Sequence, residues 1–312
     1  MVKEPLKAPF PWFGGKSRAS ELAWERFGAV RNFVEPFAGS LAVLLGRPGA
    51  ITGPETVNDL DGLLVNFWRA VRADPQAVAD AADWPVMELD LSARHSVLVE
   101  ERQQLTACLQ ADPEYYNAKL AGWWVWGACA WIGSGWCSGK GPWQRQETAE
   151  GLRLMKVDRN AGTGINRQLP HLGNAGKGDW LASLASRLRN VRVACGDWKR
   201  VLGPSVTTKH GITAVLLDPP YNSDNAENDC YGVAHSNVAD EVREWCIANG
   251  NDPLLRIALC GYESDHDELL AHGWTVESWK ARKGYQSDGE NSARERIWFS
   301  PACLRPIKGL FD

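Results

Sequence analysis

The chain has 312 residues, a formal net charge of −4, 44% hydrophobic residues and 23% charged residues. This composition supports a substantial core in one large domain or two ordinary ones and argues against wholesale disorder. No stretch approaches the roughly 20 apolar residues of a membrane span, and the opening residues lack the apolar segment of a signal peptide, so we expect a cytoplasmic protein without a membrane partner.

The first quarter of the chain is predicted to alternate strand and helix. The apolar run 32–37 predicts a buried strand, 38–40 a glycine-bearing turn, and 41–46 a helix. A second strand is expected to end near Asn58–Asp59, and helical spacing over 60–75 predicts a helix that stops at Pro75. Residues 77–132 are predicted to be helical, and residues 133–178 are predicted to form a long, irregular, basic surface region.

Alternation then resumes. A helix at 180–190 is followed by strands at 191–198 and 212–222, a helix at 238–250 and a strand at 254–262. A short helix at 263–273 and two strands at 274–281 and 294–301 close the chain. This order predicts an α/β fold with a mostly parallel sheet, helices on both faces and an antiparallel hairpin at one edge.

Four predicted strand exits carry chemistry, and ligands of such sheets bind beyond the carboxyl ends of the strands. Gly39, in "FVEPFAGS", either brings the backbone close to a ligand or merely starts a helix. Asp59, in "VND", either accepts hydrogen bonds from both ribose hydroxyls of a nucleoside or caps the following helix. In "CGDW", Asp197 and Trp198 suit an adenine amino group and ring, or a helix cap and a core side chain.

The fourth exit, Asp218-Pro219-Pro220-Tyr221, is the most specific. Proline removes a backbone donor, so a carboxylate and a carbonyl can converge as acceptors on one amino group. This geometry suits an –NH2 conjugated to a ring, because accepting both protons localises the nitrogen lone pair for attack on an electrophilic methyl group. Tyr221 can stack on that ring; the alternative is a turn that simply ends a strand.

These motifs together resemble the Dam-type family of S-adenosylmethionine-dependent DNA adenine-N6 methyltransferases, its phage and prophage members in particular. "PFPWFGGK" matches the family's aromatic-x-Gly-Gly-Lys opening, "FVEPFAGS" its methionine-binding turn, "VNDLDGLLVNFWRAV" its ribose-binding segment and "LLDPPYN" its catalytic motif. The match covers most of residues 9–79 and 190–300. One position departs from the pattern: the family has a second glycine where this chain has Leu41, and a side chain there is expected to narrow the cofactor pocket.

The resemblance implies a Rossmann-like methyltransferase domain at 1–79 and 179–312, with an inserted target-recognition domain at 80–178. The implied catalytic residues are Asp218, Pro219, Pro220 and Tyr221. The implied S-adenosylmethionine-binding residues are Trp12, Gly14, Gly15, Lys16, Glu35, Pro36, Phe37, Gly39, Ser40, Asp59, Asp197, Trp198 and Asp218. No metal is implied, and the eight cysteines include no C-x-x-C pair.

Double-stranded DNA is the implied partner, with a flipped adenine as the target. Basic residues outnumber acidic ones between Ser138 and Lys177, and we expect arginines there to read guanine edges and lysines to contact the backbone. The candidates are Arg145, Arg153, Arg159, Arg167, Lys140, Lys156 and Lys177. Core packing is favoured for Trp123, Trp124, Trp126 and Trp131, whereas Trp136 and Trp143 are predicted to stack on a base or fill its gap.

Other interpretations stay open from the sequence. The same chemistry serves N4 of cytosine or an adenine in RNA, and a DNA-binding protein with an inactive methyltransferase fold is a further possibility. Methylation of a protein glutamine amide is disfavoured by the Trp-rich basic segment and by the N-terminal Gly-Gly-Lys. A cognate restriction endonuclease is a partner that a restriction-modification enzyme would have, and the sequence does not decide this point.

Overall fold

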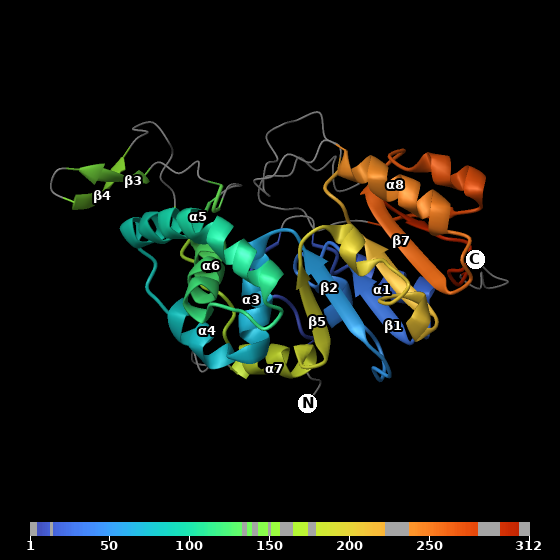
Figure 1. The fold of residues 1–312 in the computed structure, drawn as a ribbon, viewed down its shortest axis with the longest axis horizontal. Helices are drawn as coiled ribbons and strands as arrows, with labels where there is room; N and C mark the ends of the chain where they lie inside the picture. The colour runs from blue at the N-terminus through green and yellow to red at the C-terminus, as the bar shows by residue number, and fades with distance from the viewer. Residues whose placement is uncertain are drawn as a thin grey trace.

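The computed structural model describes residues 5–12, 15–132, 136–138, 143–148, 151–156, 165–173, 179–221, 237–279 and 294–305. Seven of the described strands form one sheet in the order β5-β2-β1-β6-β7-β9-β8 (Figure 1). Their bounds are β1 (Asn32–Glu35), β2 (Glu55–Asp59), β5 (Val191–Cys195), β6 (Thr213–Leu217), β7 (Leu255–Tyr262), β8 (Thr275–Ser278) and β9 (Glu295–Phe299).

The five strands from β5 to β7 run parallel, and β9 runs antiparallel to both β7 and β8. The predicted mixed α/β fold, with a mostly parallel sheet and an antiparallel pair at one edge, is therefore confirmed. This strand order is consistent with a doubly wound, Rossmann-like sheet, in which the order reverses between β1 and β6.

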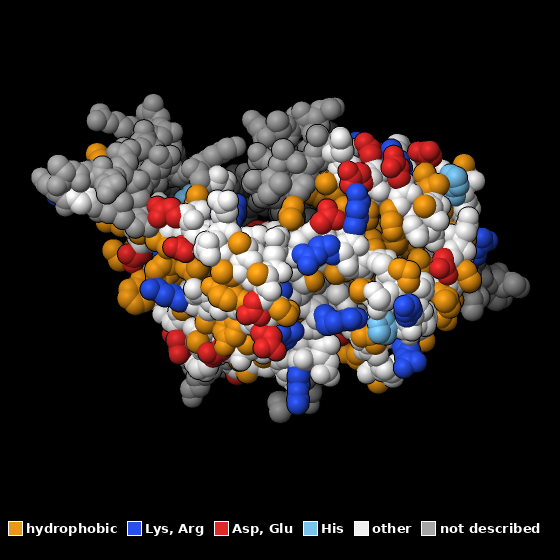
Figure 2. Space-filling model, in the orientation of Figure 1, with side chains coloured by type: hydrophobic (Ala, Val, Ile, Leu, Met, Phe, Trp, Pro, Cys, Tyr) orange, Lys and Arg blue, Asp and Glu red, His pale blue; other side chains and the backbone are white. Residues whose placement is uncertain are grey.

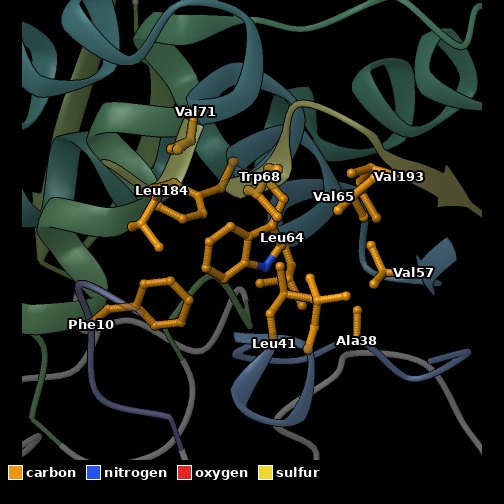
Figure 3. Close-up of a cluster of buried hydrophobic side chains, with 14 of the residues drawn as sticks. Phe10, Ala38, Leu41, Val57, Leu64, Val65, Trp68, Val71, Leu184 and Val193 are labelled. Carbon is orange, nitrogen blue, oxygen red and sulfur yellow. The ribbon is translucent and has the colours of Figure 1, made fainter. Parts of the chain in front are cut away.

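Helices cover both faces of the sheet. They are α1 (Ala19–Phe27), α2 (Ala42–Leu45), α3 (Gly62–Ala73), α4 (Pro75–Ala82), α5 (Glu88–Ala111), α6 (Ala118–Ala130), α7 (Asp179–Leu188) and α8 (Val238–Asn249), with 3-10 turns η2 (Trp198–Val201), η3 (Thr208–His210) and η4 (Asp267–His272). Consecutive strand residues face opposite layers: Phe33 joins the core under α1, α3 and α7, whereas Val34 joins the core under α8. Figure 3 shows part of the first core, which includes Trp68 of α3 and Leu184 of α7.

The prediction that a helix stops at Pro75 is confirmed, and Pro75 also starts the next helix, α4. Asp74 closes α3 and caps α4, its side chain accepting a hydrogen bond from the amide of Ala77. Proline is well tolerated in the first turn of a helix because its missing N–H would have no intrahelical partner there. The segment predicted as the helix at 263–273 forms only the 3-10 turn η4.

The helices α4 to α6 pack against α3 and share its core (Figure 1). Trp124 of α6 meets Phe67 of α3 and Phe10 of the N-terminal segment, with ring centroids 5.5 and 5.1 Å apart. Trp126 is fully buried, and Trp123 and Trp131 are partly buried against the same core. The helical half of the predicted insert is thus continuous with the sheet's core, while the division into two domains stays a prediction.

Strands β3 (Trp143–Thr148) and β4 (Gly151–Lys156) pair antiparallel beside α5 (Figure 1). The sequence prediction of irregular structure for this region was therefore wrong for these twelve residues. The two leucines at positions 152 and 154 were the available signal, but each segment is too polar to indicate a strand by itself. Backbone pairing between the two segments, which single-segment composition does not reveal, stabilises both.

Candidate functional site

A cavity of about 270 Å³ lies beyond the carboxyl ends of β1, β2, β5 and β6. It spans the point where the strand order reverses, which is where sheets of this kind bind their ligands. The described residues that line it are Trp12, Gly15, Lys16, Glu35, Pro36, Phe37, Ala38, Gly39, Ser40, Ala42, Asn58, Asp59, Leu60, Asp61, Gly196, Asp197, Trp198, Asp218, Pro220 and Val238.

The turn after β1 is built around Gly39, whose φ of +48° is one that L side chains rarely adopt. A Cβ at this position would lie 2.8 Å from Nε1 of Trp12, so the glycine also makes room for the N-terminal segment. Trp68 donates a hydrogen bond to the Gly39 carbonyl, and the Gly39 amide donates to Asp59. The turn is thereby held between the N-terminal segment, α3 and β2.

Leu41 does not line the cavity, which corrects the expectation that its side chain narrows the pocket. Its backbone is left-handed, with φ 55° and ψ 27°, a conformation that glycine adopts without strain. The side chain is fully buried among Ala38, Leu64 and Trp68 (Figure 3). This chain therefore combines a glycine-type backbone with a core side chain directed away from the ligand space.

The exit of β2 contributes three neighbouring polar side chains. Asp59 accepts hydrogen bonds from the amides of Gly39 and Asp61, at 3.2 and 3.0 Å. Burial raises the pKa of Asp59 to about 6, although these hydrogen bonds favour its ionised form. Asp61, not Asp59, caps α3, so the helix-capping interpretation of Asp59 is wrong. Asn58 donates to the carbonyls of Pro36 and Gly196, joining the exits of β1, β2 and β5.

At the exit of β5, Trp198 is buried and stacks on Phe37, with centroids 6.1 Å apart. The two rings line the same part of the cavity from β5 and β1. Asp197 is exposed and accepts a hydrogen bond from the amide of Lys199, so it caps η2 while also lining the cavity. The two interpretations of "CGDW" are therefore compatible.

At the exit of β6, Asp218 is paired with Lys16. The ammonium nitrogen of Lys16 lies 2.9 Å from Oδ1 of Asp218, and the lysine side chain is only 6% exposed. Burial opposes the charge of Lys16, but nearby acidic groups, Asp218 first among them, more than compensate and raise its pKa. Lys16, assigned to the cofactor by the resemblance, thus contacts the predicted catalytic carboxylate directly.

The remaining predicted catalytic residues are placed differently from one another. Pro220 lines the cavity, whereas Pro219 is buried and Tyr221 lies outside the lining. The hydroxyl of Tyr221 lies 3.1 Å from Oδ1 of Asp218 and 3.1 Å from Oε2 of Glu295. Its ring packs edge-on against Tyr262 at 4.6 Å, and the ammonium of Lys16 lies over it, 5.2 Å from the ring centroid. The predicted stacking of Tyr221 on a base stays a prediction.

Carboxyl groups dominate the electrostatics of the cavity. Among the described lining residues, one side chain is basic, that of Lys16, and five are acidic. The acidic ones are Glu35, Asp59, Asp61, Asp197 and Asp218. Burial, and secondarily Asp218, raises the pKa of Glu35 well above its ordinary value. Its Oε2 is buried and has no hydrogen-bond partner among the described residues. Such a site favours a ligand that carries positive charge or donates hydrogen bonds, and it disfavours phosphates.

The predicted DNA-binding residues are only partly visible. Arg153 and Arg167 are exposed. Gly14, Lys140, Arg159, Lys177 and the side chains of Trp143, Arg145 and Lys156 lie outside the described residues. On the face shown in Figure 2, the described Lys and Arg side chains are interspersed with Asp and Glu.

Trp136 is partly buried against the core, and its assignment to base stacking stays a prediction. Its Nε1 donates to the carbonyl of Trp124 at 3.0 Å, and its ring meets those of His95 and Trp131. Gly127 makes this possible, because a Cβ there would lie 1.8 Å from the Trp136 ring. The glycine-rich sequence around Trp136 suggested an exposed ring, but the decisive glycine is on α6.

Sequence reasoning missed Asn58 and Asp61, which flank the predicted Asp59, and also Glu295. Nothing local marks Glu295, which reaches the site only because β9 pairs with β7. In the described part of the chain, no group of His, Cys, Asp and Glu side chains is arranged to hold a metal ion, and no helix combines the length and apolar character that crossing a bilayer demands. No protein-family model matches this chain, and no curated protein matches it significantly.

Proposed function

We propose that the protein transfers a methyl group from S-adenosylmethionine to the exocyclic N6 of adenine in DNA. The observation that carries this proposal is that Trp12, Asp59 and Asp218, from three motifs far apart in the sequence, line one cavity at the reversal of strand order. In the resemblance these residues serve the cofactor, its ribose and the target amine. Separate cavities for the three would have ruled the proposal out.

The charge of the site supports a sulfonium cofactor. S-adenosylmethionine carries two positive groups and one carboxylate, so it has a net positive charge that suits the acidic lining. Nicotinamide dinucleotides and ATP would bring phosphates next to Asp59 and Asp61, and the one described basic lining residue, Lys16, is already paired with Asp218. The cavity therefore fits an adenosyl ligand without phosphates, its ribose hydroxyls donating to Asp59.

The proposed reaction needs an acceptor for the target amine. Among the described residues, both contacts of the Asp218 carboxylate fall on Oδ1, which leaves Oδ2 to accept from an –NH2 group. Accepting that hydrogen bond localises the nitrogen lone pair and aligns it with the methyl carbon. The carbon–sulfur bond breaks as the carbon–nitrogen bond forms. The resulting cationic nitrogen then loses a proton through Asp218 to water.

The first test is methyl transfer by the purified protein. Radiolabelled S-adenosylmethionine and unmodified duplex DNA should yield N6-methyladenine on nucleoside analysis, and Asp218→Asn should lower the rate by roughly 100-fold or more. N4-methylcytosine, or methylation of RNA only, would redirect the proposal to the corresponding acceptor. Cofactor binding without any transfer would indicate a binding module, and the absence of both would refute the proposal.

A matched pair of variants separates chemistry from folding. Asp218→Asn leaves Lys16 buried without its counter-ion, which should destabilise the protein by up to about 3 kcal/mol, the low end for a buried pair because Asp218 is partly exposed. Lys16→Met combined with Asp218→Asn removes both charges and should regain part of that stability. A double variant that is folded but inactive shows that activity is lost with the Lys16–Asp218 pair rather than through unfolding.

A further inference from the structure

Glu295 lies beside the proposed amino-group pocket although its strand is at the far end of the chain. It is the first residue of β9, opposite Tyr262 in the register with β7. It is 5% exposed, and its Oε2 lies 3.1 Å from the hydroxyl oxygen of Tyr221. Tyr262 packs edge-on against the ring of Tyr221 at 4.6 Å. The hydroxyl of Tyr221 therefore lies between Glu295 of β9 and Asp218, while Tyr262 of β7 packs against its ring.

The two hydrogen bonds of Tyr221 differ in kind, since a hydroxyl has only one proton to donate. If it donates to Asp218, the contact with Glu295 is favourable only when the glutamic acid carries a proton and donates in turn. Burial raises the pKa of Glu295, with Lys16 opposing the effect and Asp218 reinforcing it, which is the direction that this arrangement needs. In that arrangement, Glu295 donates to Tyr221 and Tyr221 donates to Asp218, and the two 3.1 Å contacts join the three groups.

This arrangement fixes the orientation of the Asp218 carboxylate. Tyr221 and Lys16 both bind Oδ1, at 3.1 and 2.9 Å. Two donors on one oxygen prevent rotation of the carboxylate and keep Oδ2 turned to its own side. An acceptor with a fixed direction matters because misplacement of a reacting group by about 1 Å can lower the rate roughly 100-fold.

We infer that Glu295 is a positioning residue for the target amino group, acting through the Tyr221 hydroxyl on Asp218. The inference rests on the proposed methyltransferase function and adds to it a residue that no motif indicates. Glu295 is not expected to contact the cofactor, because it is absent from the cavity lining. Its loss should therefore lower kcat while leaving the affinity for S-adenosylmethionine unchanged.

The test compares three single variants, Glu295→Ala, Glu295→Gln and Tyr221→Phe. A fourth, double variant combines Tyr221→Phe with Glu295→Ala. We expect Glu295→Ala to lower kcat by roughly 10- to 100-fold at an unchanged cofactor Kd measured by calorimetry. Glu295→Gln, whose amide can still donate to Tyr221, should recover most of that loss. The double variant should be no slower than Tyr221→Phe, because Glu295 has no route to Asp218 once the hydroxyl is gone.

Several outcomes would overturn the inference. A folded Glu295→Ala variant with the kcat of the wild type would do so. So would a loss of kcat on Glu295→Ala that is as large in the Tyr221→Phe background as in the wild type. A Glu295→Gln variant as slow as Glu295→Ala would also count against the inference, because the reaction would then need the carboxylic acid itself and not merely a hydrogen-bonding partner for Tyr221. The wild-type assay distinguishes the two proposals: an inactive wild type refutes both, whereas an active wild type with an unaffected Glu295→Ala refutes only this one.

Discussion

Leu41 offers a direct test of how the turn after β1 is built. The residue is fully buried, yet its backbone is left-handed, a conformation that costs an L-residue about 1–2 kcal/mol relative to glycine. Leu44 is the matched control, because it is also fully buried but lies within α2 with a helical backbone. Replacing each leucine by alanine and by glycine separates the backbone strain from the loss of packing.

The alanine variants should each lose about 2–5 kcal/mol, the usual result of truncating a buried leucine. Going on from alanine to glycine removes one more methyl group, at about 0.8 kcal/mol, and adds about 0.5–1 kcal/mol of unfolded-state entropy at both sites. At Leu41 alone, glycine also relieves the left-handed strain. The penalty of glycine relative to alanine should therefore be about 1–2 kcal/mol smaller at Leu41 than at Leu44.

Urea unfolding followed by tryptophan fluorescence measures this difference, with equal m-values as the check on two-state behaviour. Equal glycine penalties at the two positions would refute the strain argument. A second measurement addresses the pocket. Because Leu41 points into the core, Leu41→Ala should leave the affinity of the folded protein for S-adenosylmethionine unchanged within a few-fold. A marked gain in affinity would show that the leucine does narrow the cavity.

Two further predictions concern Asp59 and Trp136. Because burial raises the pKa of Asp59 to about 6, ribose hydroxyls should bind its ionised form increasingly well as pH rises from 5 to 7. The same shift means that this group's stability contribution is complete below its unfolded pKa and is lost as pH rises through about 6. Calorimetry of S-adenosylmethionine binding should show this trend in the wild type, and weaker, pH-independent binding in Asp59→Asn; flat wild-type affinity would contradict it. Trp136→Ala should lose about 3 kcal/mol of stability, the low end for a tryptophan because it is partly buried, while the folded variant keeps its DNA affinity within a few-fold. Unchanged stability with lost affinity would support the base-stacking role.

The strand exits were predictable because their signals are local. A carboxylate, glycine or proline that follows an apolar run marks where a buried strand ends, and parallel strands place such ends together. Asp59, Trp198 and Asp218 were therefore found from sequence alone, as was the mostly parallel sheet. The same reasoning could not assign Lys16 to Asp218, because the ion pair joins residues separated by about 200 positions.

Other features depended on contacts that composition hides. Trp136 sits in glycine-rich sequence and suggested an exposed ring, but Gly127 on α6 admits it to the core. The β3–β4 pair is stabilised by hydrogen bonding between two polar segments, neither of which indicates a strand by itself.

By itself, the amino-acid sequence determined the order of the strands in the main sheet and of most helices between them, the parallel character of that sheet and the chemical type of each strand exit. These properties follow from periodicity and from the backbone preferences of glycine and proline, which act over a few residues. Only the tertiary structure decided that Leu41 faces the core, that Lys16 and Tyr221 contact the same oxygen of Asp218, and that Glu295 contacts the hydroxyl of Tyr221. Side-chain direction and strand neighbours are set by packing across the whole sheet, and no local pattern encodes them.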